Sequence, residues 1–201
     1  ASAMPITKQL VVNVITVCDE NGANCASNGP SGNSFFEAEA DKIWAQAGID
    51  ISFISGPSLL SATLWNGATG IADFTSAMSG PGTTMWLVDS LVCGACTLYG
   101  EAWSGFGGLV IDMSAVLDFS VSGRLDTIAH ELGHNLGLYE EPDHDNGHDN
   151  SNANFLIASG SVRNVPGSLG EICPDPSAGS CRDLLSSEHI TIARDSSLLV
   201  D

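Results

Sequence analysis

Two histidines and a glutamate stand close together in the segment AHELGHNLGLYEEPDHD, residues 129–145. His130 and His134 are four residues apart, so on a helix turning ~100° per residue they lie on the same face and can share one tetrahedral cation. Glu131 is rotated away from them and can exchange a proton with a water on that cation. The spacing predicts a metal centre; the alternative is a pair of surface histidines on an amphipathic helix.

The helix that carries these residues is predicted over residues 122–136. Its apolar side chains recur at helical spacing and form one stripe facing a core. The histidines project from the opposite side of the helix. The members of the stripe are Leu125, Ile128, Ala129, Leu132 and Leu136.

The chain before this helix is predicted to alternate strands with one further helix. Ser34 and Glu37 have the spacing of a capping box, and Gly48 stands where that helix would end. Runs of β-branched and apolar residues indicate strands on either side of it. A glycine-rich stretch, residues 99–108, leads into the last of them. The predicted strands cover residues 9–17, 49–55, 83–92 and 109–111.

Composition limits what the chain can be. With 201 residues, 43% hydrophobic and 15% charged, it has the make-up of one folded domain. Its net charge of −18 opposes binding to nucleic acid and to anionic membranes. It contains no apolar run of the roughly 18–20 residues that a membrane-spanning helix needs. We therefore expect neither nucleic-acid binding nor membrane insertion.

The six cysteines fall into three close pairs: Cys18 with Cys25, Cys93 with Cys96, and Cys173 with Cys181. Buried free thiols are one alternative. Another is a zinc knuckle or redox centre at Cys93 and Cys96, but the chain has no second Cys-x-x-Cys. Short disulfides within each pair are the simplest prediction, and they imply a secreted or periplasmic protein.

The segment HELGHNLGLYE resembles the signature of metzincin zinc metallopeptidases, His-Glu-x-x-His-x-x-Gly-x-x-His. His130, Glu131, His134 and Gly137 fill four of its five fixed positions. The resemblance implies an α+β fold with a twisted mixed sheet, an active-site helix, a C-terminal helix and an edge strand that pairs with substrate. It implies a single catalytic domain, residues 1–201, with a zinc cleft between an upper subdomain (1–137) and a lower one (138–201).

This chain departs from the signature at two places. Glu140 occupies the third-ligand position, where it could bind zinc through a carboxylate oxygen. His144 is the alternative, reached by a loop that bulges by four residues, and His148 and Glu188 rank below both. Residues 152–166 are similar to the Met-turn beneath the metal but have no methionine, because Leu156 or Ile157 stands there.

The resemblance implies a zinc-dependent endopeptidase, a monomer acting on peptides or proteins through a metal-activated water with Glu131 as general base and acid. The alternative is a metal-binding module that has lost turnover. Calcium is a second candidate metal, because Asp143, Asp145 and Asp149 offer oxygen ligands around Gly147. The competing interpretation of that stretch is a solvated loop.

Overall fold

The computed structural model describes residues 3–138 and 147–201, and its centre is a six-stranded sheet. The strands are β1 (Lys8–Cys18), β2 (Ile49–Ser55), β3 (Leu59–Leu60), β4 (Thr83–Val88), β5 (Gly100–Ala102) and β6 (Leu109–Asp112). The α-helices are α1 (Glu37–Ala45), α2 (Ala62–Gly67), α3 (Met113–Asp118), α4 (Thr127–Asn135) and α5 (Ser187–Arg194). Short 3₁₀ helices are η1 (Ser34–Phe36), η2 (Ile71–Asp73) and η3 (Leu169–Glu171).

The sheet is mixed, with the order β2-β1-β4-β6-β5 and with β3 paired to the end of β1. Its first four strands in this order run parallel, and α1 makes the crossover between β1 and β2 that parallel neighbours require. β5 runs antiparallel to β6 and lies at the edge. The outer backbone groups of β5 are therefore open to pairing with another extended chain.

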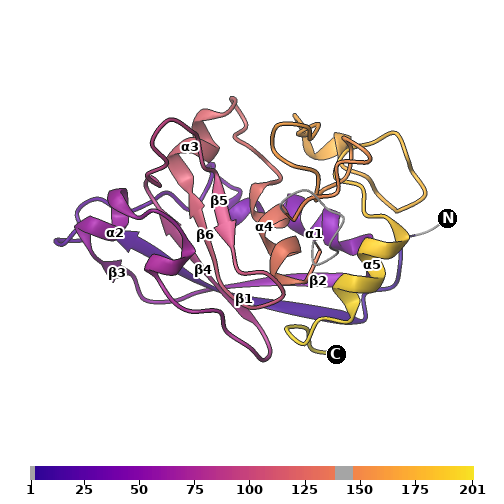
Figure 1. Ribbon diagram of the computed structural model, residues 1–201, viewed down its shortest axis with the longest axis horizontal. Coiled ribbons are helices and arrows are strands. Elements are labelled where there is room, and N and C mark those ends of the chain that lie inside the picture. The colour runs from indigo at the N-terminus through magenta and orange to yellow at the C-terminus, as the bar shows by residue number, and fades with distance from the viewer. Residues whose placement is uncertain (1–2, 139–146) are drawn as a thin grey trace.

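Both faces of the sheet are covered (Figure 1). On β4, Met85 and Leu87 pack into the larger apolar cluster together with side chains of α1 and α4. Trp86 and Val88 point to the opposite face and join a second cluster that includes Ile71. Because residues on both faces of β4 are buried, its sequence is a continuous apolar run and does not alternate between apolar and polar residues.

Two element boundaries in the structure differ from the predicted ones. The strand predicted at 83–92 ends at Val88, and the helix predicted at 122–136 begins at Thr127. Residues before Thr127 form a turn, in which the backbone N–H of Arg124 donates to the carbonyl of Val116 at 2.8 Å. The chain needs this turn because Arg124 and Asp126 enter a buried ionic cluster described below.

The predicted capping box of Ser34 and Glu37 is wrong. Phe35 and Phe36 adopt left-handed backbone angles, with φ of 61° and 50°, and end the η1 turn before α1 begins. The cap residue of α1 is Phe36, which accepts no hydrogen bond through its side chain. Both phenyl rings are buried, so core packing outweighs the local capping preference.

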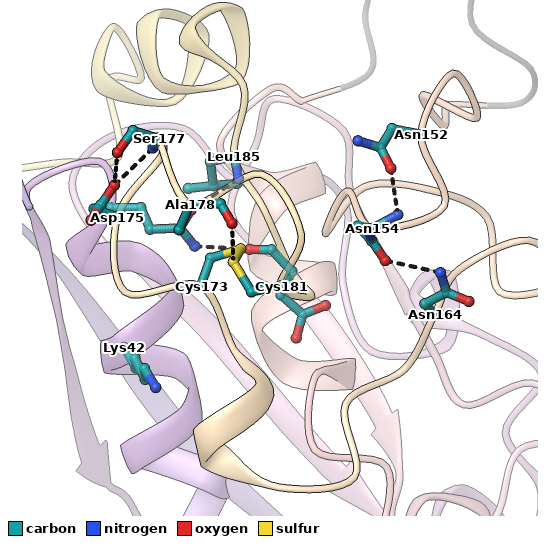
Figure 2. The surroundings of a disulfide bond; sticks show 12 residues. Lys42, Asn152, Asn154, Asn164, Cys173, Asp175, Ser177, Ala178, Cys181 and Leu185 are labelled. Carbon is teal, nitrogen blue, oxygen red and sulfur yellow. Dashed lines mark hydrogen bonds between the residues drawn. A yellow bond between two sulfur atoms is a disulfide. The ribbon is translucent and has the colours of Figure 1, made fainter. Parts of the chain in front are cut away.

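The cysteines form the three local disulfides that their spacing suggests. Figure 2 shows the Cys173–Cys181 bridge together with Asn154 and Asn164. Asn164 donates through Nδ2 to Oδ1 of Asn154 at 2.9 Å, while the backbone N–H of Leu184 donates to the carbonyl of Asn154 at 2.8 Å. These contacts hold the bend of residues 154–164 in place. No helix in the described ranges is long and apolar enough to cross a membrane.

Candidate active site

Helix α4 places His130, Glu131 and His134 at the wall of a cleft. The two imidazoles face each other with their Nε2 atoms 3.2 Å apart. The helix ends at Asn135, and Gly137 follows the C-cap residue with a φ of 92°: its N–H donates to the carbonyl of His134, and the N–H of Leu138 donates to that of Gly133. This is a Schellman turn, which favours glycine at the left-handed position, as the motif predicts.

His148 completes a cluster of three histidines. Its ring centroid lies 5.4 Å from that of His130 and 5.1 Å from that of His134. One ligand nitrogen from each ring lies within 4.8 Å of the others. The favoured third ligand, Glu140, and its alternative, His144, lie outside the described residues, whereas His148, ranked below both, stands beside the other two.

The spacing of the nitrogens suits zinc. Zinc–nitrogen bonds of about 2.0–2.1 Å in a tetrahedral shell place two ligand nitrogens about 3.3 Å apart. The observed 3.2 Å between Nε2 of His130 and Nε2 of His134 is close to that value. Burial lowers the pKa of His134 to about 3 and that of His130 well below its usual range. Both rings are therefore neutral at physiological pH, the form that a metal needs.

The backbone of the bend at 154–164 orients His130. Nδ1 of His130 lies 2.7 Å from the carbonyl oxygen of Leu156. A carbonyl can only accept, so Nδ1 carries the proton and Nε2 keeps its lone pair for a metal. Arg163 Nη1 also lies 2.7 Å from this nitrogen, but a protonated Nδ1 cannot accept, and Nη1 donates instead to Ala158 O at 2.8 Å.

A buried ionic cluster lies next to His130. Arg163 donates through Nε to Oδ2 of Asp126 at 2.7 Å and through Nη2 to Oδ1 at 3.4 Å. Burial alone would lower the pKa of Arg163, but the charge and hydrogen bonds of Asp126 raise it overall. Burial and the nearby Asp126 raise the pKa of Asp183 well above its usual range, while Arg163 opposes the rise.

Glu131 is buried against the edge strand. A Cβ on Gly100 of β5 would lie 3.0 Å from Cγ and 3.1 Å from Oε1 of Glu131, so only glycine leaves room for this side chain. Burial raises the pKa of Glu131 to about 8; Glu101 adds to the rise, and Arg163 and Arg124 oppose it. A cation on the adjacent histidines would favour the ionised carboxylate.

Asn135, the last residue of α4, fastens the edge strand to the helix. Its Nδ2 donates to the carbonyls of Trp103 and Gly108, both at 2.9 Å, and its Oδ1 accepts from Oγ1 of Thr83 at 2.8 Å. Asn135 is fully buried, and all three partners belong to the sheet or to the β5–β6 connection. This network fixes the distance between β5 and the histidines.

The cleft has a volume of about 460 Å³, within the range of ligand pockets. The cleft is lined by residues 97–102, by the start of α4 with its two histidines, and by His148, Gly160 and Arg163. The spacing of the motif predicted His130, Glu131 and His134. Arg124, Arg163 and Asn135 were not predicted, because nothing in a single sequence distinguishes a buried arginine or asparagine from an exposed one.

The described residues give no support for the calcium site considered above. Asp149 uses one carboxylate oxygen to accept from Ser151 and the other to accept from Nε2 of His189 at 3.2 Å. Asp143 and Asp145 lie outside the described residues. Within residues 3–138 and 147–201, the three histidines form the one cluster suited to a metal. His189 itself is buried and caps α5 by pairing with Ser186.

No family model matches the chain, and no curated protein matches it significantly. Among solved structures, archaemetzincin from Methanopyrus kandleri superposes with a TM-score of 0.54 at 14% identity, over 94% of this chain and 95% of that one. Archaemetzincin from Archaeoglobus fulgidus, complexed with malonate, gives 0.49 at 15% identity over 92% and 99%. A zinc-dependent peptidase from Methanocorpusculum labreanum gives 0.46 at 10% over 90% and 99%. The first of these shows that the chain has a mixed α/β fold like that of an archaemetzincin.

Proposed function

We propose that the chain is a zinc-dependent endopeptidase in which His130, His134 and His148 hold the metal. The observation that carries this proposal is the convergence of three imidazoles beside a buried glutamate in one cleft. Zinc bound there would lower the pKa of a water ligand and polarise the scissile carbonyl. The fold shared with an archaemetzincin supports the same class of reaction.

Each neighbouring residue has a role in this reaction. Glu131 accepts a proton from the attacking water and later delivers it to the leaving amine nitrogen. Its burial beside Gly100 keeps bulk water away from the carboxylate and points it at the cleft. The carbonyl of Leu156 holds the His130 ring in the required tautomer.

The edge strand β5 supports cleavage within a chain. Its outer backbone groups can pair with an extended peptide laid along the cleft, so that peptide bonds far from either end reach the histidines. We propose a peptide or protein substrate and a monomeric enzyme. Three disulfides favour an oxidising compartment, so the proposed site of action is outside the cell or in a periplasm.

A metal-binding module without turnover is the second candidate, because no methionine lies beneath the metal site. Leu156 and Ile157 occupy that bend and are both buried. A Cβ on Gly133 of α4 would lie 3.4 Å from Cδ1 of Ile157, so the isoleucine already supports the helix from below. This apolar support favours the active enzyme over the inactive module.

Zinc analysis tests the metal site first. We expect one zinc per chain, and His148→Ala should weaken zinc affinity at least tenfold, since a ligand is lost. Glu140→Gln and His144→Ala serve as matched controls and should retain zinc. Protein without stoichiometric zinc would overturn the proposal, and retention of zinc by His148→Ala would reject His148 as the ligand.

Turnover is tested with Glu131→Gln, which keeps the shape of the side chain but cannot accept a proton. The variant should bind zinc and cleave peptides about 10²–10⁴-fold more slowly than the wild type. Equal cleavage rates would exclude Glu131 as the general base. Stoichiometric zinc with no cleavage of a diverse peptide library by the wild type would favour the inactive module.

A further inference from the structure

Arg124 is a buried cation in the cleft wall that the reaction above does not use. It lines the same cavity as Glu131 and the histidines, and little of its surface reaches solvent. Its Nε atom is buried without a hydrogen-bond partner among the described residues, since Oδ1 of Asp126 lies 3.8 Å away. Buried guanidinium groups normally have their donors satisfied, so an unpaired donor in a cavity indicates a missing acceptor.

Two aromatic rings hold the guanidinium in place. The Cζ atom of Arg124 lies 4.2 Å from the ring centroid of Tyr99 and 5.2 Å from that of Phe119. Stacking on aromatic rings covers the faces of the planar group and leaves the in-plane N–H edge to bind a partner. A Cβ on Gly160 would lie 3.3 Å from Nη2 of Arg124, so this glycine leaves space beside the guanidinium.

A second unpaired donor lines the same cavity. Thr127, the first residue of α4, follows Arg124 by three residues in the chain. Its Oγ1 is buried and makes no hydrogen bond within the part of the chain that the structure describes. A guanidinium edge and a hydroxyl on one wall are the donors that recognise a carboxylate.

The charges around Arg124 leave room for an anion. Asp126 is bound by Arg163 through two hydrogen bonds, whereas Nε of Arg124 approaches Oδ1 of Asp126 only to 3.8 Å, so one carboxylate lies between two guanidinium groups. Burial and the charge of Arg163 lower the pKa of Arg124 overall, and the nearby Asp126 and Tyr99 offset only part of that effect. Glu101 also lines the cleft, but its Oε2 accepts from the N–H of Ile71, outside the cavity wall formed by α4.

We propose that Arg124 and Thr127 bind a carboxylate of the substrate, so that the enzyme selects an acidic residue close to the scissile bond. A peptide paired with β5 directs alternate side chains to the same side, and Arg124 lines the same cavity as Glu131 and the histidines. This inference rests on the proposed peptidase function, but the binding experiment that tests it does not require peptidase activity.

The test measures binding without zinc and therefore without turnover. Peptides with blocked ends, identical except for one glutamate or glutamine scanned along the sequence, are titrated into the wild-type protein in chelator at 0.15 M salt. A glutamate at the selected position should tighten binding about tenfold to a hundredfold, the range of a charge-assisted hydrogen bond. A further set of peptides with a free carboxyl terminus shows whether the bound group is a terminal carboxylate or a side chain.

Substitutions in the cleft test whether the preference for glutamate arises there. Arg124→Gln should abolish it, and Thr127→Val should reduce it severalfold while preserving shape. Arg182→Gln is the matched control, because it removes the same charge from a half-exposed side chain paired with Glu171 and should keep the preference. Asp126 keeps its bonds to Arg163 in Arg124→Gln, which favours folding of that variant.

Three outcomes would overturn the proposal: no preference for glutamate in the wild type, a preference that persists in Arg124→Gln, or one unaffected by Thr127→Val. The first and third do not depend on the folding of an arginine variant. Failure of zinc binding would refute the peptidase function and leave this result unchanged. A wild-type protein that binds zinc and cleaves peptides but shows no preference for glutamate would refute only the carboxylate site.

Discussion

Replacement of Arg163 by methionine should destabilise the protein more than any surface substitution. The change removes a cation that donates to Asp126 at 2.7 Å and 3.4 Å and to the carbonyl of Ala158 at 2.8 Å. Methionine fills a similar space but leaves Asp126 as a buried charge and the carbonyl without its donor. Removal of one partner of a buried ion pair costs about 3–5 kcal/mol.

The neighbouring Arg124 affects how large the loss of stability is within that range. Arg124 Nε lies 3.8 Å from Oδ1 of Asp126 and can offset part of the lost positive charge. We therefore expect a loss of about 3 kcal/mol in the free energy of unfolding. For a chain of this size, each kcal/mol lowers the melting temperature by about 2–4 °C, so the melting point should fall by about 6–12 °C.

Urea unfolding followed by circular dichroism measures this loss, with disulfides intact and chelator present so that metal binding does not contribute. Arg182→Met is the matched control; its partially exposed ion pair with Glu171 should be worth about 1 kcal/mol or less. The double variant Arg163→Met with Asp126→Asn should be more stable than the sum of the two losses predicts. A loss below about 1 kcal/mol for Arg163→Met, or strict additivity in the double variant, would refute the buried ion pair as a source of stability.

Two further predictions concern other parts of the fold. Burial raises the pKa of Asp41 from 3.8 to about 6, so the folded state holds a proton that the unfolded state has released, and stability should fall as pH rises from about 4 to 6. The full pKa shift corresponds to about 3 kcal/mol of stability, which partial exposure of the carboxyl reduces to about 1 kcal/mol. Asp41→Asn should abolish this pH dependence in urea unfolding. An unchanged pH profile in the variant would contradict the prediction. Gly137→Ala should cost about 1 kcal/mol in the same assay because φ is 92°, whereas Gly179→Ala, with ordinary φ and open space around it, should be nearly neutral; equal losses would exclude backbone conformation as the cause.

Local patterns predicted the parts of the site that a helix places by itself. The spacing of His130 and His134 sets their common face, and Gly137 ends the helix where the motif requires. The strands were predicted for a similar reason, since a buried strand needs a run of apolar residues. Each of these features depends on residues within about two turns of one another along the chain.

The features that local patterns missed depend on contacts between distant segments. His148 meets His130 across a connection whose length does not specify its path, because the entropy of loop closure changes slowly with length. The Ser34 capping box failed because two phenyl rings, Phe35 and Phe36, gain more from burial in the core than the cap offers. Arg124 and Arg163 are two of the six basic residues, and no local pattern around either of them indicates its buried partners.

The attachment of Asp149 to the body of the protein ties the third histidine of the cluster to α5. Asp149 follows His148 directly; its carboxylate accepts from Nε2 of His189 on α5, and its N–H donates to the carbonyl of Ile157. These anchors fix His148 from its carboxyl-terminal side. The position of His148 therefore depends on α5 and on the bend that contains Ile157, two segments far from α4 in the sequence.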